Sequence, residues 1–149
     1  MVEKIGGKRS NYFIDHVDTE WCYRARSSGY SLVGVHDAFL EHSLGDDVKW
    51  IWLLYVRYVP YHTPLRDYYM FRNTIFCVRD TKRLRTWRML LIFRLIQFVS
   101  YFLIFAPDRI VRAKMMVKGL CHGILGVEGR LNLSNGRCDK VPKTPLDPN

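Results

Sequence analysis

The chain has 149 residues, of which 48% are apolar and 14% aromatic, and its formal net charge is +9. This length suits one ordinary domain, and the apolar content excludes an intrinsically disordered chain. Residues 1–78 are electrically balanced, with nine Lys/Arg and nine Asp/Glu, so the positive excess lies in residues 79–149. Such asymmetry predicts an anionic partner, which could be a lipid surface, a nucleic acid or substrate phosphates.

The first half of the chain predicts short elements of both kinds. Apolar and small residues recur at helical spacing in residues 18–27, which Asp18 or Thr19 would cap and Gly29 would end. Residues 30–36 then alternate between apolar and polar side chains, as a half-buried strand does. We therefore expect a short mixed α/β part with one or two strands.

The middle of the chain changes from loop and apolar segments to helix. Residues 43–47 are polar and predict a loop, and the aromatic segment 50–59 is ended by Pro60. Pro64 is suited to open a helix over residues 65–79.

A basic run at residues 82–88 leads directly into an apolar segment, and together they predict a helix over 86–105. Arg94, Gln97 and Ser100 fall three residues apart, on one helical face. A spanning helix needs about 20 residues that are mostly free of charge, so we favour an amphipathic helix lying in the plane of a membrane surface. Burial against the rest of the protein and a true span are the alternatives.

The C-terminal part contains a second basic and apolar segment at residues 110–125, which predicts another helix. Residues 129–149 are rich in Asn, Lys, Pro and Asp, so we expect a flexible tail.

The cysteines and the N-terminus bear on the cellular compartment. The four cysteines form no CxxC pair, which excludes the usual zinc-binding motifs. Residues 1–9 lack the apolar stretch of a signal peptide. We therefore expect free thiols and a reducing compartment.

Two polar clusters carry the chemistry that the sequence suggests. The segment from Phe13 to Arg26 contains three carboxylates, of Asp15, Asp18 and Glu20. A second cluster at residues 41–47 contains His42 and further carboxylates. Carboxylates followed by a histidine are the groups that a divalent cation and a general base require.

Together with Gly29-Tyr30 and the block Arg66-Asp-Tyr-Tyr-Met-Phe-Arg-Asn73, these clusters resemble the C-terminal part of inverting family 2 glycosyltransferases. The resemblance runs from about residue 5 to residue 128 and is to bacterial rhamnosyltransferases that build surface polysaccharides such as O-antigen. It implies a GT-A fold of the α/β class followed by amphipathic, membrane-associating helices. Residues 1–64 would be the acceptor-side half of the catalytic domain, 65–128 the helical membrane region and 129–149 the tail.

The resemblance also implies what this chain does not carry. The family holds its metal and nucleotide diphosphate with an Asp-x-Asp triplet in a preceding half, and this chain has no such triplet. We therefore expect the chain to be truncated, inactive alone and to retain no metal, whereas the complete enzyme would use Mn²⁺ or Mg²⁺.

The roles of the first cluster follow from the resemblance. Asp18 would be the catalytic base, with a helix N-cap as its alternative role. Asp15 and Glu20 would bind acceptor hydroxyls; the alternative for Glu20 is an ion pair with Arg24, four residues on.

The remaining site residues are assigned in the same way. His42 would complete the metal site, and its alternative is a loop histidine that binds nothing. Arg66 and Arg72 would bind phosphate, or would stabilise the fold instead. We expect the other four histidines, His16, His36, His62 and His122, to be structural.

The resulting interpretation is a glycosyltransferase that transfers a 6-deoxyhexose from a dTDP-sugar to a lipid-linked oligosaccharide. It would work at the cytoplasmic face of the bacterial inner membrane, peripherally bound to the anionic lipid surface, with no nucleic-acid partner. The alternatives are a non-catalytic membrane-associated remnant and a small basic protein that binds membranes or nucleic acid.

Overall fold

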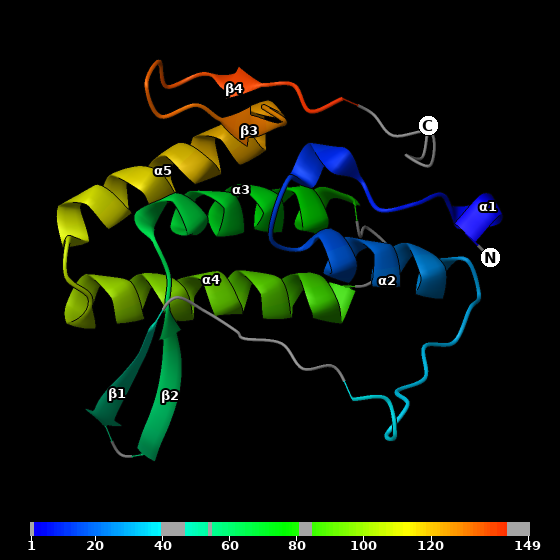
Figure 1. The fold of residues 1–149 in the computed structure, drawn as a ribbon, viewed down its shortest axis with the longest axis horizontal. Helices are drawn as coiled ribbons and strands as arrows, with labels where there is room; N and C mark the ends of the chain where they lie inside the picture. The colour runs from blue at the N-terminus through cyan, green and yellow to red at the C-terminus, as the bar shows by residue number, and fades with distance from the viewer. Residues whose placement is uncertain (1, 40–46, 54, 81–84, 143–149) are drawn as a thin grey trace.

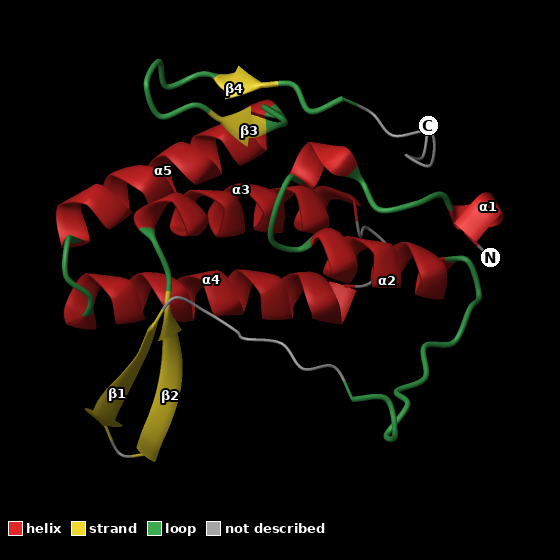
Figure 2. Ribbon diagram, in the orientation of Figure 1, coloured by secondary structure: helices red, strands yellow, loops and turns green. Residues whose placement is uncertain are grey.

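The computed structural model describes residues 2–39, 47–53, 55–80 and 85–142. Its elements follow one another along the chain and are shown in Figures 1 and 2. They are α1 (Val2–Ile5), the 3₁₀ helix η1 (Ser10–Tyr12), α2 (Val17–Ser27), β1 (Asp47–Leu53), β2 (Tyr55–Tyr61), α3 (Pro64–Asp80), α4 (Arg85–Phe105), α5 (Arg109–Leu125), β3 (Arg130–Leu131) and β4 (Cys138–Asp139).

Helix α3 is the centre of the structure, and α5 lies directly against it (Figure 1). Two glycines four residues apart, Gly119 and Gly123, bring the two helices close together. A Cβ atom on Gly119 would overlap the backbone carbonyl of Tyr68, and one on Gly123 would lie 2.8 Å from Cβ of Ile75. The sequence therefore lets these helices pack backbone to backbone, with no room for a side chain between them.

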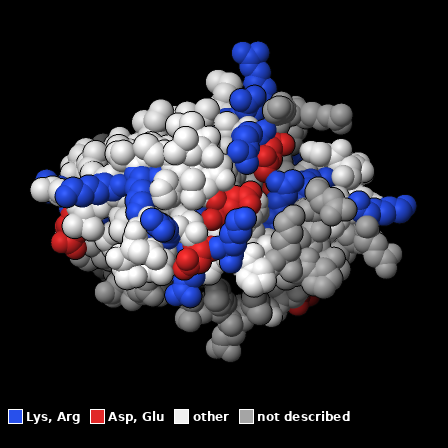
Figure 3. All heavy atoms as spheres, turned by 90° about the horizontal axis from the view of Figure 1, so that it is seen from above, with Lys and Arg blue, Asp and Glu red and all other residues white. Residues whose placement is uncertain are grey.

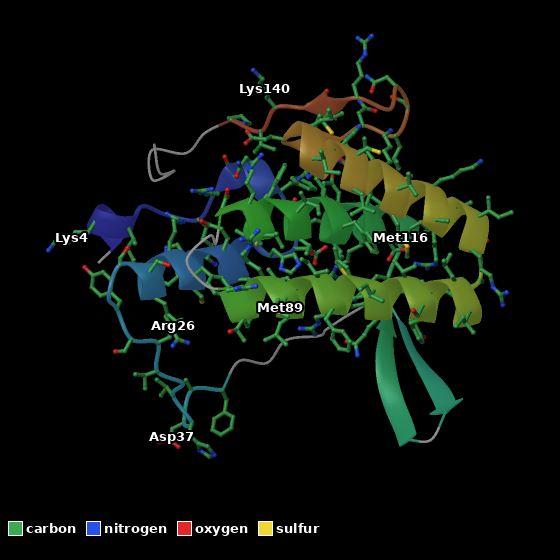
Figure 4. The ribbon with its side chains drawn as sticks, turned by 180° about the vertical axis from the view of Figure 1, so that it is seen from behind. Lys4, Arg26, Asp37, Met89, Met116 and Lys140 are labelled. Carbon is green, nitrogen blue, oxygen red and sulfur yellow. The ribbon has the colours of Figure 1, made fainter. Side chains whose placement is uncertain are left out.

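Helix α4 packs against the other two long helices through one face. Leu91, Leu95 and Phe102 are buried and recur at spacings of four and seven, as one helical face requires. The core around Leu95 and Phe102 also contains Phe71 from α3 and Met116 from α5. Met116 is labelled in Figure 4. Trp87, Phe98, Val99 and Tyr101 are partly buried against the same helices, and most of the other described α4 side chains are exposed.

Helix α2 and the segment before it cover the end of α3 and the start of α4 (Figure 1). The ring of Tyr12 is buried and meets Phe76 of α3 with 5.7 Å between centroids. The ring of Tyr23 in α2 lies 4.7 Å from that of Trp87 in α4. The N-terminal residues are thus joined to the helical region by buried aromatic contacts.

Two antiparallel hairpins complete the fold. In the first, Asp47 lies opposite Tyr61 and Leu53 opposite Tyr55. In the second, Arg130 lies opposite Asp139. The buried side chain of Leu131 packs beside Tyr69. Residues 129–142 are therefore not the flexible tail that was expected, because an apolar anchor and the hairpin hold their first part against α3.

All four predicted helices are confirmed, and the strand predicted over residues 30–36 is wrong. The predictions over 18–27, 65–79, 86–105 and 110–125 correspond to α2, α3, α4 and α5. Residues 30–36 form no strand. Val33 and Val35 are exposed, so the apolar side chains of the alternating pattern pack against nothing that would stabilise a strand. Pro60 does not end its segment either, since β2 continues to Tyr61 in a two-stranded hairpin that tolerates proline.

The four cysteines all lie within the described residues, and none of them forms a disulfide there.

Candidate functional site

The two motif blocks of the sequence meet in space. Arg72 is fully buried, and its guanidinium donates to the carbonyls of Gly129 at 2.6 Å and Tyr12 at 2.9 Å. Asn73, its neighbour, donates to the carbonyls of Tyr12 at 2.9 Å, Ile14 and Asp15 at 3.1 Å. Arg72 and Asn73 of α3, which both belong to the second sequence block, thus hold the backbone of residues 12–15 through hydrogen bonds.

The held segment has an unusual backbone. Phe13, Asp15 and His16 have positive φ angles of 65°, 55° and 59°, which non-glycine residues rarely adopt. His16 is in the left-handed helical region, whereas Phe13, with ψ of −67°, forms a γ-turn. Each such residue costs on the order of 1–3 kcal/mol and persists only where the surroundings enforce it. The hydrogen bonds from Arg72 and Asn73 supply that enforcement, and they leave Asp15 and His16 side by side just before α2.

A pocket of about 220 Å³ opens beside this turn. Its walls come from the start of α2 and from the facing sides of α3 and α4. The lining residues are Asp15, His16, Thr19, Met70, Thr74, Leu91, Arg94, Leu95 and Phe98. The pocket is therefore polar along residues 15–19 and mostly apolar along the two long helices.

Asp15 is the buried carboxylate of this pocket. Its side chain is only 12% exposed, and Oδ1 accepts from Nε of Arg66 at 3.1 Å. Its Oδ2 is buried, and no donor among the described residues reaches it. One oxygen of this carboxylate is thus paired with Arg66, and the other is enclosed by the protein.

His16 lies next to Asp15 in a defined protonation state. Its Nε2 is 2.9 Å from Oγ1 of Thr74, and that hydroxyl donates its single hydrogen to the carbonyl of Met70 at 2.7 Å. Thr74 must therefore accept, so Nε2 of His16 carries a hydrogen and Nδ1 holds a lone pair. Burial lowers the pKa of His16, partly offset by Asp15 and reinforced by Arg94, which favours this neutral form.

Asp18 lies in the first turn of α2, outside the group of residues that line the pocket. Its side chain is 77% exposed and forms an ion pair with Lys8 at 2.5 Å. It does not cap the helix, because the residue at the N-cap position is His16. Its neighbour Thr19 does line the pocket, so Asp18 is one residue removed from that wall.

Glu20 has a structural place. It is buried, and it pairs with Arg24 at 2.7 Å and with Arg9 at 3.3 Å. Arg24 in turn donates to the carbonyls of Ile5 and Gly7. This is the alternative that the sequence left open for Glu20, and it argues against acceptor binding because both carboxylate oxygens are committed to Arg24.

The two arginines of the second block, Arg66 and Arg72, differ in their exposure and in their hydrogen-bond partners. Arg72 has no exposed surface and donates from all three nitrogens, to Asn73, Gly129, Tyr12 and Asn11. This corrects the phosphate-binding prediction for Arg72, since a phosphate would have to displace backbone partners from a closed core. Arg66 is 40% exposed and holds Asp15, so a phosphate role for it stays a prediction.

The metal site cannot be assembled from the residues that the structure describes. The predicted ligand His42 lies outside them. Within the described ranges, no three His, Cys, Asp or Glu side chains gather as ligands. The carboxylates of the first cluster are turned to Lys8, Arg24 and Arg66 instead, so they do not fit a divalent cation.

Of the residues that line the pocket, sequence reasoning assigned only Asp15 to a site. His16 was expected to be structural, Thr19 was named only as a possible helix cap, and Thr74 and Arg94 were given no role. The adjacency of His16 to Asp15 was a visible signal, but the left-handed backbone that turns them together has no signature in the sequence. Arg94 was visible as the charge that interrupts an apolar helix.

Comparison with known proteins gives one partial similarity. A dTDP-rhamnosyl transferase of Shigella flexneri, RfbF, is 34% identical over 79 residues, which are 53% of this chain and 26% of that protein. The chain thus spans about a quarter of the length of the curated relative it matches, and the match indicates a glycosyltransferase-related region. No protein-family model matches the chain, and no solved structure matches it.

Proposed function

We propose that this chain is the acceptor-side part of a rhamnosyltransferase-like glycosyltransferase with a GT-A catalytic domain. The observation that carries the proposal is the partial similarity to a dTDP-rhamnosyl transferase. The hydrogen bonds from Arg72 and Asn73 to residues 12–15 support it, because they join the two sequence blocks on which the family resemblance rests. The reaction transfers a 6-deoxyhexose from a dTDP-sugar to a lipid-linked oligosaccharide of a surface polysaccharide such as O-antigen.

In this proposal Asp18 is the general base. It takes the proton from an acceptor hydroxyl as that oxygen forms a bond to C1 of the donor sugar, and the bond from C1 to the dTDP oxygen breaks with inversion. The exposed carboxylate can meet an incoming sugar without first leaving a buried site, and Lys8, with which it forms an ion pair, is itself exposed. Nucleotide and metal binding would use the family's Asp-x-Asp triplet together with His42, and the triplet is absent from this sequence.

The proposal places α4 against the anionic cytoplasmic face of the inner membrane. Exposed apolar side chains lie along the helix: Met89, Leu90, Ile92, Phe93, Ile96, Leu103 and Ile104. Because the opposite face is also apolar, α4 is not the amphipathic helix that was predicted. A helix with exposed apolar side chains over much of the surface that the protein leaves uncovered needs a second apolar environment.

Helix α4 is also long and apolar enough to cross a membrane, with a mean hydropathy of 1.5 over residues 85–104, of which 17% is buried in the protein. Leu91, Leu95 and Phe102 are already used in the core, which favours docking on the surface over spanning. Arg85 at the start of the helix would meet lipid headgroups, at roughly 1 kcal/mol per charge. Figure 3 shows the face over β3–β4, on which acidic and basic side chains are mixed. That face is therefore a weaker candidate for docking on an anionic membrane than the exposed surface of α4.

The proposal is tested with a chimaera. In the Shigella flexneri dTDP-rhamnosyl transferase, the segment that matches this chain is replaced by a segment of this chain that includes Asp18 and Asp37. Transfer from dTDP-rhamnose to a membrane acceptor is then measured. We expect turnover that Asp18→Asn lowers by about 10²–10⁴ and that Asp37→Asn, a change in an exposed loop, does not affect. A chimaera that folds and binds the donor but transfers no sugar would count against the proposal.

A further inference from the structure

A cysteine, a tyrosine and a histidine meet between the C-terminal hairpin and the two packed helices. Cys138 belongs to β4, Tyr68 to α3 and His122 to α5, and none of the three lines the pocket beside α2. The phenol oxygen of Tyr68 is 2.8 Å from Nδ1 of His122 and 3.2 Å from Sγ of Cys138. The sulfur is itself 3.8 Å from the same Nδ1. The fold thus connects a thiol to an imidazole through a phenol.

The chemistry of the three groups sets the order of donors among them. A phenol is a good donor and an imidazole nitrogen a good acceptor, whereas sulfur is a weak acceptor. The single hydrogen of Tyr68 therefore goes to Nδ1 of His122, and the thiol of Cys138 donates to the phenol oxygen. A proton that leaves the sulfur can reach the imidazole along hydrogen bonds that already exist.

His122 is able to take up that proton. Burial lowers the pKa of His122, and the positive charges of Lys118 on α5 and Arg72 on α3 lower it further, so the imidazole is neutral near pH 7. Burial also raises the pKa of Tyr68, which keeps the phenol protonated and able to pass a hydrogen on. The resting arrangement is therefore a thiol, a phenol and a free base.

The sulfur can be reached from outside the protein. Cys138 is partly exposed, whereas Tyr68 has no exposed surface. The strand β4 that carries Cys138 lies over α3 and α5 at the edge of the molecule (Figure 1). A partly exposed thiol beside a base is typical of reactive cysteines. Cys77 shows the opposite setting, because it is fully buried and burial raises its pKa to about 12.

We propose that Cys138 is a nucleophilic thiol that forms mixed disulfides with low-molecular-weight disulfides, and that Tyr68 and His122 carry its proton away. Sγ attacks one sulfur of the small disulfide, so that a new S–S bond forms as the old one breaks. The thiol proton passes to the phenol oxygen, whose own proton passes to Nδ1. The departing thiolate takes up a proton from water, and the imidazolium returns one. A thiol and a disulfide are consumed, and a mixed disulfide and a thiol are formed.

The test follows the cysteines of the full chain in one experiment. The reduced protein is incubated with oxidised glutathione near neutral pH and quenched with acid, and mass spectrometry of its peptides gives the rate of mixed-disulfide formation at each cysteine. Cys121 is the internal comparison, because it is exposed and lies one residue before His122 on α5. We expect Cys138 to react at least about tenfold faster than Cys121, although it is less exposed.

Two variants test the proton path. His122→Asn keeps an acceptor for the Tyr68 hydroxyl but cannot take up a proton, and Tyr68→Phe keeps the ring but removes the relay. Each should slow Cys138 by at least about tenfold near neutral pH and leave Cys22 on α2 unchanged. The difference should close as the pH approaches the ordinary thiol pKa of about 8.5, where thiolate forms without a base. His36→Asn, in an exposed loop, is the matched control and should react like the wild type.

Several results would overturn the proposal. One is a Cys138 that reacts no faster than Cys121 in the wild type. Another is a pair of variants that react as fast as the wild type. A rate deficit that persists at high pH would also do so, because it would show blocked access to the sulfur rather than a lost base. Should a variant unfold, as circular dichroism would reveal, the comparison of Cys138 with Cys121 in the wild type decides. None of these results depends on sugar transfer, which the chimaera tests separately.

Discussion

Asn73 donates a hydrogen bond to the backbone carbonyl of Asp15 at 3.1 Å, across 58 residues of sequence. The same amide group also bonds the carbonyls of Tyr12 and Ile14. Together with Arg72, this one side chain of α3 therefore fixes the strained turn that carries the Asp15 carboxylate of the pocket. This relationship gives a physical reason why an acidic block and a Tyr-Tyr-x-x-Arg-Asn block occur in one protein: the second holds the first in shape.

The first prediction concerns that hold. Replacing Asn73 with Ala leaves three backbone carbonyls with fewer donors and frees a left-handed turn, so we expect a loss of about 2–4 kcal/mol in the free energy of unfolding. Urea denaturation measures it. Gln97→Ala removes an amide from the exposed side of α4 and is the control. A loss below about 1 kcal/mol would mean that the turn is held by other contacts.

The second prediction concerns the contact between α3 and α5. An exposed helical glycine changed to alanine would gain stability by about 1 kcal/mol. Gly123→Ala should instead lose about 1–3 kcal/mol, because the new Cβ would lie 2.8 Å from Cβ of Ile75 and 3.0 Å from the carbonyl of Arg72. Gly34→Ala, where a Cβ meets nothing within 4 Å, is the matched control in thermal unfolding. A more stable Gly123→Ala protein would contradict the close packing.

The sequence predicted the helices well because each has a period or a boundary residue that acts locally. Pro64 begins α3, and the uninterrupted apolar segment fixes α4. What it did not predict depends on distant contacts. Leu131 lies in a segment of polar composition, and only its contact with Tyr69 shows that it is a core residue. Arg72 was predicted to bind phosphate, and only the structure shows that it bonds backbone carbonyls instead. The pocket could not be predicted because its shape depends on a left-handed turn imposed from 58 residues away.

The third prediction concerns pH. Burial lowers the pKa of His16 below its ordinary 6.5, so the folded state binds fewer protons than the unfolded state. The stability from a neutral His16 is full above about pH 6.5 and is lost as pH falls toward the lowered value. Burial raises the pKa of Asp67 to about 6, although the nearby Arg112 opposes the rise. Asp67 therefore titrates in the same pH range, and its contribution is present in every variant compared.

We therefore compare how the free energy of unfolding changes with pH in the wild type and in variants. Between about pH 7 and pH 5.5 the wild type should lose more stability than His16→Asn, in which the titrating group is absent. His36→Asn, from a loop histidine that is 97% exposed, should follow the wild type. Parallel profiles for the wild type and His16→Asn would show that His16 is not held neutral.

The fourth prediction concerns the exposed face of α4. The full chain should bind vesicles that contain anionic lipid, and the binding should weaken with salt as the charges on the basic side chains are screened. Replacing Ile92 and Ile96 with Asn should weaken binding by at least about tenfold, since each side chain contributes up to about 1.5–3 kcal/mol when it enters the lipid. Val33→Asn with Val35→Asn, two exposed changes in a loop, is the control in vesicle pelleting.

The last prediction concerns the nucleotide sugar. A diphosphate must be met by a metal or by several donors. This chain has no Asp-x-Asp triplet, and within the described residues its carboxylates are turned to Lys8, Arg24 and Arg66 rather than toward one another. We therefore expect calorimetry with dTDP-rhamnose and Mn²⁺ to detect no micromolar binding to this chain, with or without a chelator.

The vesicle-binding activity of the same preparation is the control that the protein is folded and intact. Two or three scattered ligands rarely retain a divalent cation, so adding excess Mn²⁺ should not rescue donor binding. The Arg66→Gln variant should also show no micromolar binding of dTDP-rhamnose. Arg66 is already paired with Asp15, and by itself it cannot balance the charge of two phosphates. Micromolar binding that a chelator abolishes would mean that this chain builds a metal site of its own, and the assignment of the chain to the acceptor side would fall.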